Sequence, residues 1–314
     1  MTRLRLRPRL RPLSSADWWA SVAGAVSLLL AGCSAASESG IPDCPGVGAP
    51  RVLLDKQGPL ESIAFDASGR LLFTNMTQKA LMRMDLPGAQ PVTAAAGLSS
   101  PGGIAVVNEH EAYVGTGNSL NGLIPSLGMA GIAYVDLDTG AVKPFVSGLS
   151  MANGMVRAKD GTFYASDDLS KSLDRVLPDG TVQRGWLPLN SNGLALSLDQ
   201  KTLYVNQLMP AKVFAVDRET GAISLVVEAP PARKWTWLDG LDIDSQGRLY
   251  VVAYFGGEVW RVEPKTGQIC VAAKGLRLPS AVAVGHLDHL ARGGDGAERV
   301  RHLRERHDLR SRPE

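Results

Sequence analysis

One position of a repeated sequence pattern carries side chains suited to binding a metal ion. The pattern occurs six times between residues 60 and 285, and its second residue is, in order, Glu61, Gly102, Asn153, Asn192, Asp239 and Ser280. If the repeats form equivalent structural units, two carboxylates and two carboxamides converge on one axis. Their oxygens are ligands that hard divalent cations such as Ca²⁺ prefer, whereas zinc would favour His or Cys, which the set lacks. The six positions therefore predict a site for Ca²⁺ or another hard divalent cation.

A β-turn is the alternative interpretation of these positions. Asn-Gly and Asp-Gly are common turn dipeptides, and they occur at Asn153-Gly154, Asn192-Gly193 and Asp239-Gly240. Each of them, however, directly precedes an apolar strand pattern, and the hairpin turns follow several residues later. Glu61 is not a turn-forming residue. The cation site is therefore the favoured interpretation.

Each repeat continues with the same order of predicted strands and turns. In the fifth repeat, a turn at 246–247 is followed by an aromatic and β-branched strand at 249–251, an alternating strand at 259–263 and a turn at 265–267. Four strands in a repeat of this length are typical of a β-propeller blade, and their alternation excludes helical repeats. The first strand of each blade lines the central channel, so the six second positions form a ring at one mouth. We therefore predict an all-β fold, a six-bladed β-propeller over residues 51–285, with a last blade that lacks recognisable second and third strands.

Residues 286–314 do not continue the sixth repeat. They contain seven Arg and four of the five His of the chain, without any alternation of apolar residues. Two interpretations stay open for this atypical charged tail. We favour a change of reading frame near Gly285, and the alternative is a natural solvated tail on an incomplete ring. In neither case do we assign its His and acidic residues to a metal site.

The first 32 residues have the features of a bacterial lipoprotein signal peptide. Five Arg precede an apolar stretch from Trp18 to Ala31, which is shorter than the roughly 20 residues of a membrane span. The stretch ends in Leu30-Ala31-Gly32-Cys33, which resembles a lipobox, where the cysteine becomes residue one and is lipid-modified. We expect lipidation at Cys33, a tether over residues 33–50 and a bacterial protein anchored outside the cytoplasm, at the periplasmic face or the cell surface. An ordinary signal peptide is the alternative.

Charge and cysteine content exclude other classes of protein. The net charge is +2, but residues 33–285 hold 21 basic and 24 acidic residues, which argues against a basic nucleic-acid-binding face. Three cysteines are too few for a disulfide scaffold. In an oxidising compartment, Cys44 and Cys270 either form a disulfide or remain two unpaired thiols. We expect a monomer that binds a small molecule, no nucleic acid, and a membrane only through its lipid.

The blades resemble the senescence marker protein/gluconolactonase/luciferin-regenerating enzyme family of six-bladed propellers over about residues 51–285. The resemblance is carried by Glu61-Ser62-Ile63-Ala64-Phe65, Ser191-Asn192-Gly193-Leu194 and Leu238-Asp239-Gly240-Leu241. It implies that Glu61, Asn192 and Asp239 bind a divalent cation, usually calcium, and that Asp239 is also the general base. It further implies that Asn153 contacts the substrate or acts as an indirect ligand of the cation. Met151 stands where the sugar-lactone hydrolases of the family have an Arg, so the chain departs from them at a residue for sugar recognition.

Two long gaps between repeats predict an apolar wall above this ring. An insertion at 118–131 and a loop at 228–237 supply the hydrophobic residues Leu120, Leu123, Ile124, Leu127, Met129, Trp235 and Trp237. A largely apolar wall above a cation suits a lipophilic ester or lactone. The alternative is that these side chains only pack on one another.

These expectations combine into a function. The favoured one is a lipid-anchored, calcium-dependent hydrolase of lactones or related esters, with Asp239 catalytic and Asn153 contacting the substrate. The first alternative is a non-catalytic propeller that binds a partner and holds a structural cation. The second is an enzyme like strictosidine synthase, which would not need the complete set of oxygen ligands. The fold by itself does not decide among them.

Overall fold

The computed structural model describes residues 40–46, 50–85, 88–119 and 130–285, which, apart from Gly40, belong to one compact unit that begins at Ile41. The described residues form five four-stranded antiparallel sheets. The first contains β1 (Leu60–Phe65), β2 (Leu71–Asn75), β3 (Ala80–Met84) and β4 (Val92–Ala96). The second contains β5 (Ile104–Val106), β6 (Glu111–Thr116), β7 (Ala130–Asp136) and β8 (Val142–Leu149). The third contains β9 (Met155–Arg157), β10 (Phe163–Asp167), β11 (Ser172–Val176) and β12 (Val182–Leu187).

The last two sheets follow the same plan. The fourth contains β13 (Ser191–Leu196), β14 (Thr202–Gln207), β15 (Lys212–Asp217) and β16 (Ile223–Glu228). The fifth contains β17 (Leu238–Ile243), β18 (Leu249–Ala253), β19 (Glu258–Glu263) and β20 (Gln268–Lys274). A short 3₁₀ helix, η3 (Pro231–Arg233), lies between these two sheets in the chain. Among the described residues, no helix is both long and apolar enough to span a bilayer.

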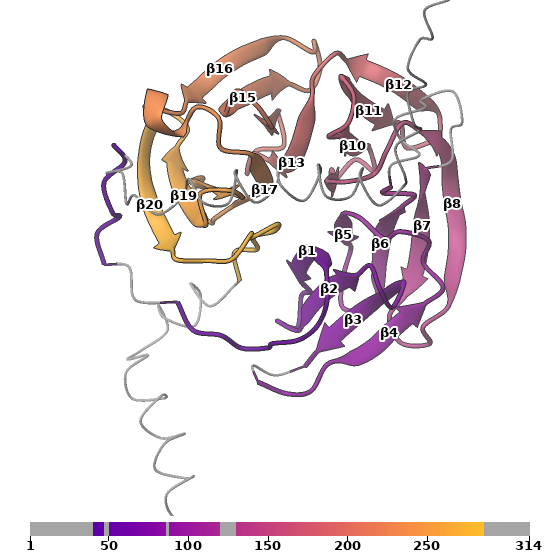
Figure 1. Cartoon of the computed structure of the whole chain (residues 1–314). Coiled ribbons are helices and arrows are strands. Elements are labelled where there is room, and N and C mark those ends of the chain that lie inside the picture. Colours follow the sequence, from indigo (N-terminus) through magenta and orange to yellow (C-terminus); the bar gives the residue numbers. More distant parts are fainter. Residues whose placement is uncertain (1–39, 47–49, 86–87, 120–129, 286–314) are drawn as a thin grey trace, which may run out of the picture. The chain divides into compact units, whose positions relative to one another are not determined.

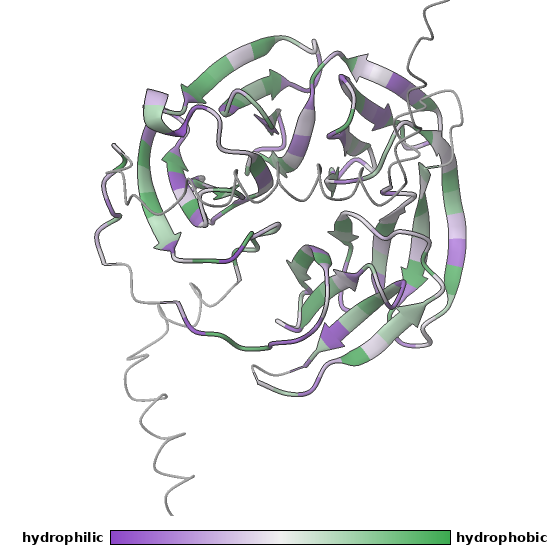
Figure 2. Cartoon of the chain, in the orientation of Figure 1, coloured by the Kyte–Doolittle hydropathy of each residue, from purple (hydrophilic) through white to green (hydrophobic). Residues whose placement is uncertain are grey.

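Strands pair in sequence order within every sheet, and the first strands of successive sheets contact each other near the centre (Figure 1). This is the architecture of a β-propeller. The core lies between neighbouring sheets: Leu72 and Leu81 of the first sheet, for example, share a buried cluster with Val114 and Val135 of the second. Figure 2 shows hydrophobic residues in all five sheets, with hydrophilic residues between them.

The prediction of six blades was wrong, because the described residues form five. Residues 276–285 contain no strand, although they run where the first strand of a sixth blade would lie. The amide of Gly240 in β17 donates to the carbonyl oxygen of Ser280 over 2.8 Å, and the Ser280 hydroxyl donates to the carbonyl oxygen of Leu60 in β1 over 3.0 Å. A sixth blade would need at least one further strand hydrogen-bonded to this segment. Residues 286–314, which would have to supply it, lie outside the described residues. The predicted signal peptide at 1–32 and Cys33 lie outside them as well.

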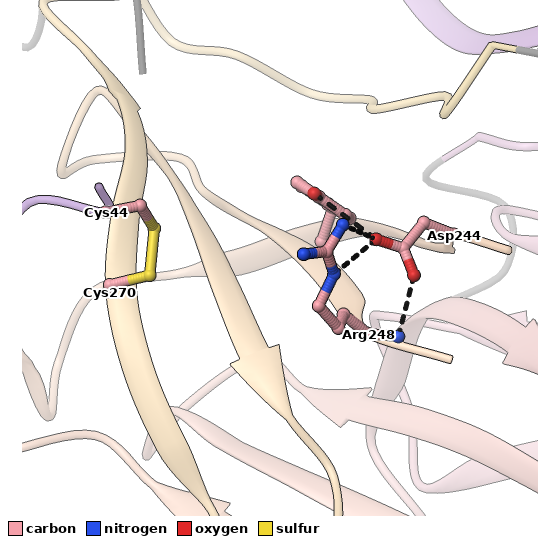
Figure 3. The surroundings of a disulfide bond; sticks show 5 residues. Cys44, Asp244, Arg248 and Cys270 are labelled. Carbon is pink, nitrogen blue, oxygen red and sulfur yellow. Dashed lines mark hydrogen bonds and ion pairs between the residues drawn. A yellow bond between two sulfur atoms is a disulfide. The ribbon is translucent and has the colours of Figure 1, made fainter. Parts of the chain in front are cut away.

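An N-terminal segment is fastened to the fifth sheet. Asp43 pairs in parallel with Val271 of β20, and a disulfide joins Cys44 to Cys270 (Figure 3). Ile41 is buried in the hydrophobic cluster of this sheet. Farther along the chain, Leu54 packs against the cluster of the first sheet. The segment therefore links the first and last blades of the described ring.

The turns after β1 and β17 are stabilised in the same way, by an aspartate that binds backbone amides of the turn and forms an ion pair with an arginine. Asp244 accepts hydrogen bonds from the amides of Gln246 and Arg248 at 2.9 Å, and its carboxylate also pairs with the Arg248 guanidinium (Figure 3). Asp66 and Arg70 repeat the arrangement in the first sheet. Both turns lie at the end of the first strand, away from the residues that begin it.

Candidate functional site

The predicted ring residues lie at irregularities where first strands begin. Pairing with the second strand shifts between Leu60 and Ile63 in β1, between Ser191 and Leu194 in β13, and between Leu238 and Leu241 in β17. Glu61, Asn192 and Asp239 fall within these three shifts. A β-bulge locally breaks the ladder and re-aims a side chain, which lets a strand residue project toward the ring.

Polar residues of the second strands accept hydrogen bonds from amides at the beginning of the first strands. Thr74 Oγ1 accepts from the amide of Ser62 at 2.9 Å, and Ser166 Oγ accepts from Gly154 at 2.8 Å. Asn206 Oδ1 accepts from Gly193 at 2.8 Å, and its amide group donates to the backbone carbonyl of Asp239. Buried backbone groups need such partners, so the second strands hold the ring backbone in place.

Five of the six ring residues, all except Gly102, line one pocket of about 1100 Å³. Asn153 Nδ2 donates to Glu61 Oε1 over 2.9 Å, and the side chain of Asn192 is hydrogen-bonded to Asp239. Gly102 offers only its carbonyl oxygen, which accepts from Thr74. The hydroxyl of Ser280 is engaged with Leu60. The structure thus brings Glu61, Asn153, Asn192 and Asp239 together.

Two further polar residues of the site, Asn118 and Asp168, were not predicted. Asn153 Nδ2 lies 3.4 Å from Asn118 Oδ1 and 3.5 Å from Asp168 Oδ2. Asn118 lies two residues after the second strand β6, and Asp168 directly follows the second strand β10. Because second strands are antiparallel to first strands, they end at the edge where the first strands begin. A search for polar residues just after each second strand would have found them.

The carboxyl groups of the site all have raised pKa values. Burial raises the pKa of Glu61 to about 7, and the negative charge of Asp168 adds to the effect. Burial raises the pKa of Asp239 to about 8, with further contributions from the charges of Glu61 and Asp168. The pKa of Asp168 rises to about 6 through burial and the neighbouring Asp167. No described lysine or arginine offsets these increases, so the site holds three buried acids without a cationic partner.

This donor set fits a hard divalent cation. Buried carboxylates need a compensating positive charge, which a cation beside Glu61 and Asp239 would supply. No three His, Cys, Asp or Glu side chains of the described residues are grouped closely enough to hold a metal by themselves. Amide oxygens must therefore complete the shell, and Asn192, bonded to Asp239, is placed to contribute one.

We expect the metal-free protein to lose stability between pH 5 and pH 8.5. The folded-state pKa values of Glu61 and Asp239 lie above their ordinary values of 4.5 and 3.8, so the folded protein binds more protons than the unfolded chain in this range. The stabilisation is complete below those ordinary values and is lost as the pH rises through about 7 and 8. Urea unfolding in EDTA would measure the decline. Asp239→Asn should make it shallower, and an equally steep decline in that variant would contradict the assignment.

Only some residues of the predicted apolar wall are described by the structure, and only one of these lines the pocket. Trp237 lines the pocket, whereas Trp235 is 66% exposed and does not. Leu120, Leu123, Ile124, Leu127 and Met129 lie outside the described residues. Met151, at the position compared with an arginine, is buried and also lines the pocket.

Comparisons with known proteins show the family to which the chain belongs. Residues 60–290 match the family described as the SMP-30/gluconolactonase/LRE-like region. The chain is 31% identical to regucalcin from Oryctolagus cuniculus over 224 residues, which are 65% of this chain and 70% of that protein. Across several curated relatives, the matched share of the relative's length ranges from 34% to 70%.

Solved structures share the propeller fold at low sequence identity. A gluconolactonase from Xanthomonas campestris superposes with a TM-score of 0.60 at 20% identity, covering 77% of this chain and 89% of that one. A calcium-binding regucalcin from Agrobacterium tumefaciens superposes with a TM-score of 0.58 at 16% identity, covering 77% and 82%.

Proposed function

Since this chain belongs to the SMP-30/gluconolactonase/LRE-like family, we propose that it hydrolyses lactones or related esters, and that the pocket around Asp239 is its active site. The observation that carries the proposal is the convergence of Glu61, Asn153, Asn192 and Asp239 on one pocket, with buried acids that have no cationic partner among the described residues. Such a site combines a place for a metal with a carboxylate that can accept a proton.

In this proposal, Glu61, Asn192 and Asp239 hold a divalent cation. A cation bound there would polarise the substrate carbonyl and stabilise the oxyanion that develops on it. Calcium is the proposed ion because the ligands are all oxygens and because a superposable relative is a calcium-binding protein.

Asp239 is the proposed general base. Its carboxylate takes a proton from a water molecule, whose oxygen attacks the carbonyl carbon. The bond between that carbon and the ester oxygen breaks, and the proton passes to the leaving oxygen, so a lactone yields a hydroxy acid. The hydrogen bond between Asn192 and Asp239 orients the carboxylate.

Hydrolysis of a substrate panel, with and without chelator, tests this function. We expect the full chain to hydrolyse at least one of glucono-1,5-lactone, γ-nonalactone and phenyl acetate, to lose that activity in EDTA, and to regain it with added calcium. Tight calcium binding and a raised melting temperature without any hydrolysis would contradict the enzyme and favour a binding propeller with a structural cation.

We further propose that the protein is lipid-anchored through Cys33, on the evidence of Leu30-Ala31-Gly32-Cys33. In a bacterial host, Cys33→Ser should move the protein from the membrane fraction to the soluble fraction, because the modified thiol is lost. Fractionation followed by immunoblotting measures the change. Unchanged membrane retention of the variant would refute lipidation at this residue.

A further inference from the structure

We propose that the pocket beside Asp239 binds an alkyl or aryl substituent of the substrate, so that lipophilic lactones and esters are preferred over polyhydroxylated ones. The inference rests on the proposed hydrolytic function and specifies its substrate class. It follows from how the polar and apolar residues are distributed around the pocket.

One wall of the pocket is an aromatic cluster attached directly to the strand that carries Asp239. Trp237 lies two residues before Asp239, and the amide of Tyr254 donates to the Trp237 carbonyl oxygen over 2.8 Å. The ring of Phe255 stands edge-on to both, with centroid distances of 5.6 Å to Trp237 and 5.2 Å to Tyr254. This cluster offers a large apolar surface at a fixed position relative to the proposed base.

Much of the rest of the lining is aliphatic or aromatic. It is formed by Leu53, Leu54, Leu60, Phe73, Met76 and Leu278. Leu53 and Leu278 are 44% and 57% exposed, whereas Phe73 is buried in the core of the first sheet. Among the described residues, Leu53 and Leu278 therefore present apolar surface to the pocket.

Arg51 and Arg277 also line the pocket, and several of its other polar groups are already engaged. Asn153 Nδ2 bonds to Glu61, Asn192 bonds to Asp239, and the hydroxyl of Ser280 bonds to Leu60. Over much of the pocket, the hydroxyl groups of a polyhydroxylated substrate would lie against carbon atoms. They would lose their hydrogen bonds to water without gaining others, which is unfavourable. An alkyl chain or aryl ring would instead exchange water for apolar contacts along both walls. The cavity of about 1100 Å³ has room for such a group.

Binding of lactams that resemble lactones tests this inference separately from catalysis. Isothermal titration calorimetry of the full chain with calcium would use 5-methyl-, 5-propyl- and 5-hexyl-2-pyrrolidinone, whose ring amide resists hydrolysis. We expect affinity to rise along the series, by up to about fourfold for each methylene that becomes fully buried. Trp237→Ala should weaken binding of the hexyl compound by about tenfold. Trp235→Ala is the matched control and should leave the series unchanged.

A second pair of variants covers the possibility that Trp237→Ala disturbs folding. Leu278→Ser alters an exposed residue of the pocket and should flatten the series, whereas Leu225→Ser alters an equally exposed residue on β16, outside the pocket, and should not. Affinity independent of chain length in the parent protein would overturn the inference, even if some lactone were hydrolysed. A steep series sensitive to Trp237 and Leu278 would support the pocket assignment, even if no lactone were hydrolysed and the proposed activity failed.

Discussion

Replacing Asp239 with Asn should lower the hydrolysis rate at saturating calcium by about 10²–10⁴-fold, the usual loss when a general base is removed. The asparagine retains an oxygen that can bind the cation but cannot accept the proton of the attacking water. Calcium should still bind, more weakly, because the site loses one negative charge. The measurements are the calcium dissociation constant and the turnover rate at a calcium concentration that fills the variant's site.

Glu61→Gln is the matched control for this experiment. It also removes one negative charge from the same buried site, but from a residue assigned only to metal binding. Its activity should recover substantially when calcium is raised. In addition, the charge of Glu61 raises the pKa of Asp239, so its removal should lower that pKa and shift the acidic limb of the pH–rate profile to lower pH. Equal recovery of both variants at high calcium would exclude Asp239 as the base.

Loss of the disulfide should produce the largest change in stability. Cys44 and Cys270 are 226 residues apart in sequence, so their bond strongly restricts the unfolded chain. We expect the double variant Cys44→Ala/Cys270→Ala to lose about 2–5 kcal/mol of unfolding free energy. Release of the segment would also free Ile41 from the core of the fifth sheet and Asp43 from its ion pair with Lys274.

Urea unfolding of the parent and double variant, each with and without dithiothreitol, measures this contribution. The reductant should lower the midpoint of the parent toward that of the variant and leave the variant unchanged. Comparing the two proteins with and without reductant separates the stability that the covalent bond contributes from the effect of the two alanine substitutions. Identical midpoints for oxidised parent and variant would show that the disulfide adds no stability.

Repetition made most of the fold predictable from sequence. A pattern seen once at Asp239-Gly240 resembles a turn, but its recurrence at Asn153 and Asn192, each before a strand, indicates a propeller and places these side chains around one axis. The same reasoning overcounted the blades. Leu278 to Gly285 matches the start of a repeat, yet a blade is defined by hydrogen bonds between strands, and no described strand forms a sheet with this segment.

Residues outside the repeated pattern were harder to predict. Asp168 follows β10 and has no aspartate counterpart after the other second strands, so the repeat itself did not mark it, and only its position at the end of a second strand could have done so. Trp235 and Trp237 look equivalent in sequence, but only Trp237 is held beside the pocket, through the backbone bond between its carbonyl oxygen and Tyr254. Long-range contacts of this kind depend on how loops pack, which alternation and spacing do not record.

Gly154 and Gly193, which follow two of the ring residues, allow the backbones of neighbouring blades to approach closely. A methyl group on Gly154 would collide with the carbonyl oxygen of Asn192, and one on Gly193 would collide with that of Asp239. The spacing between neighbouring blades therefore depends on these glycines and not on the residue that precedes each of them. An alanine at either glycine would force two neighbouring blades apart and displace the ring residues that they carry, whereas a substitution of the preceding side chain leaves this backbone contact in place.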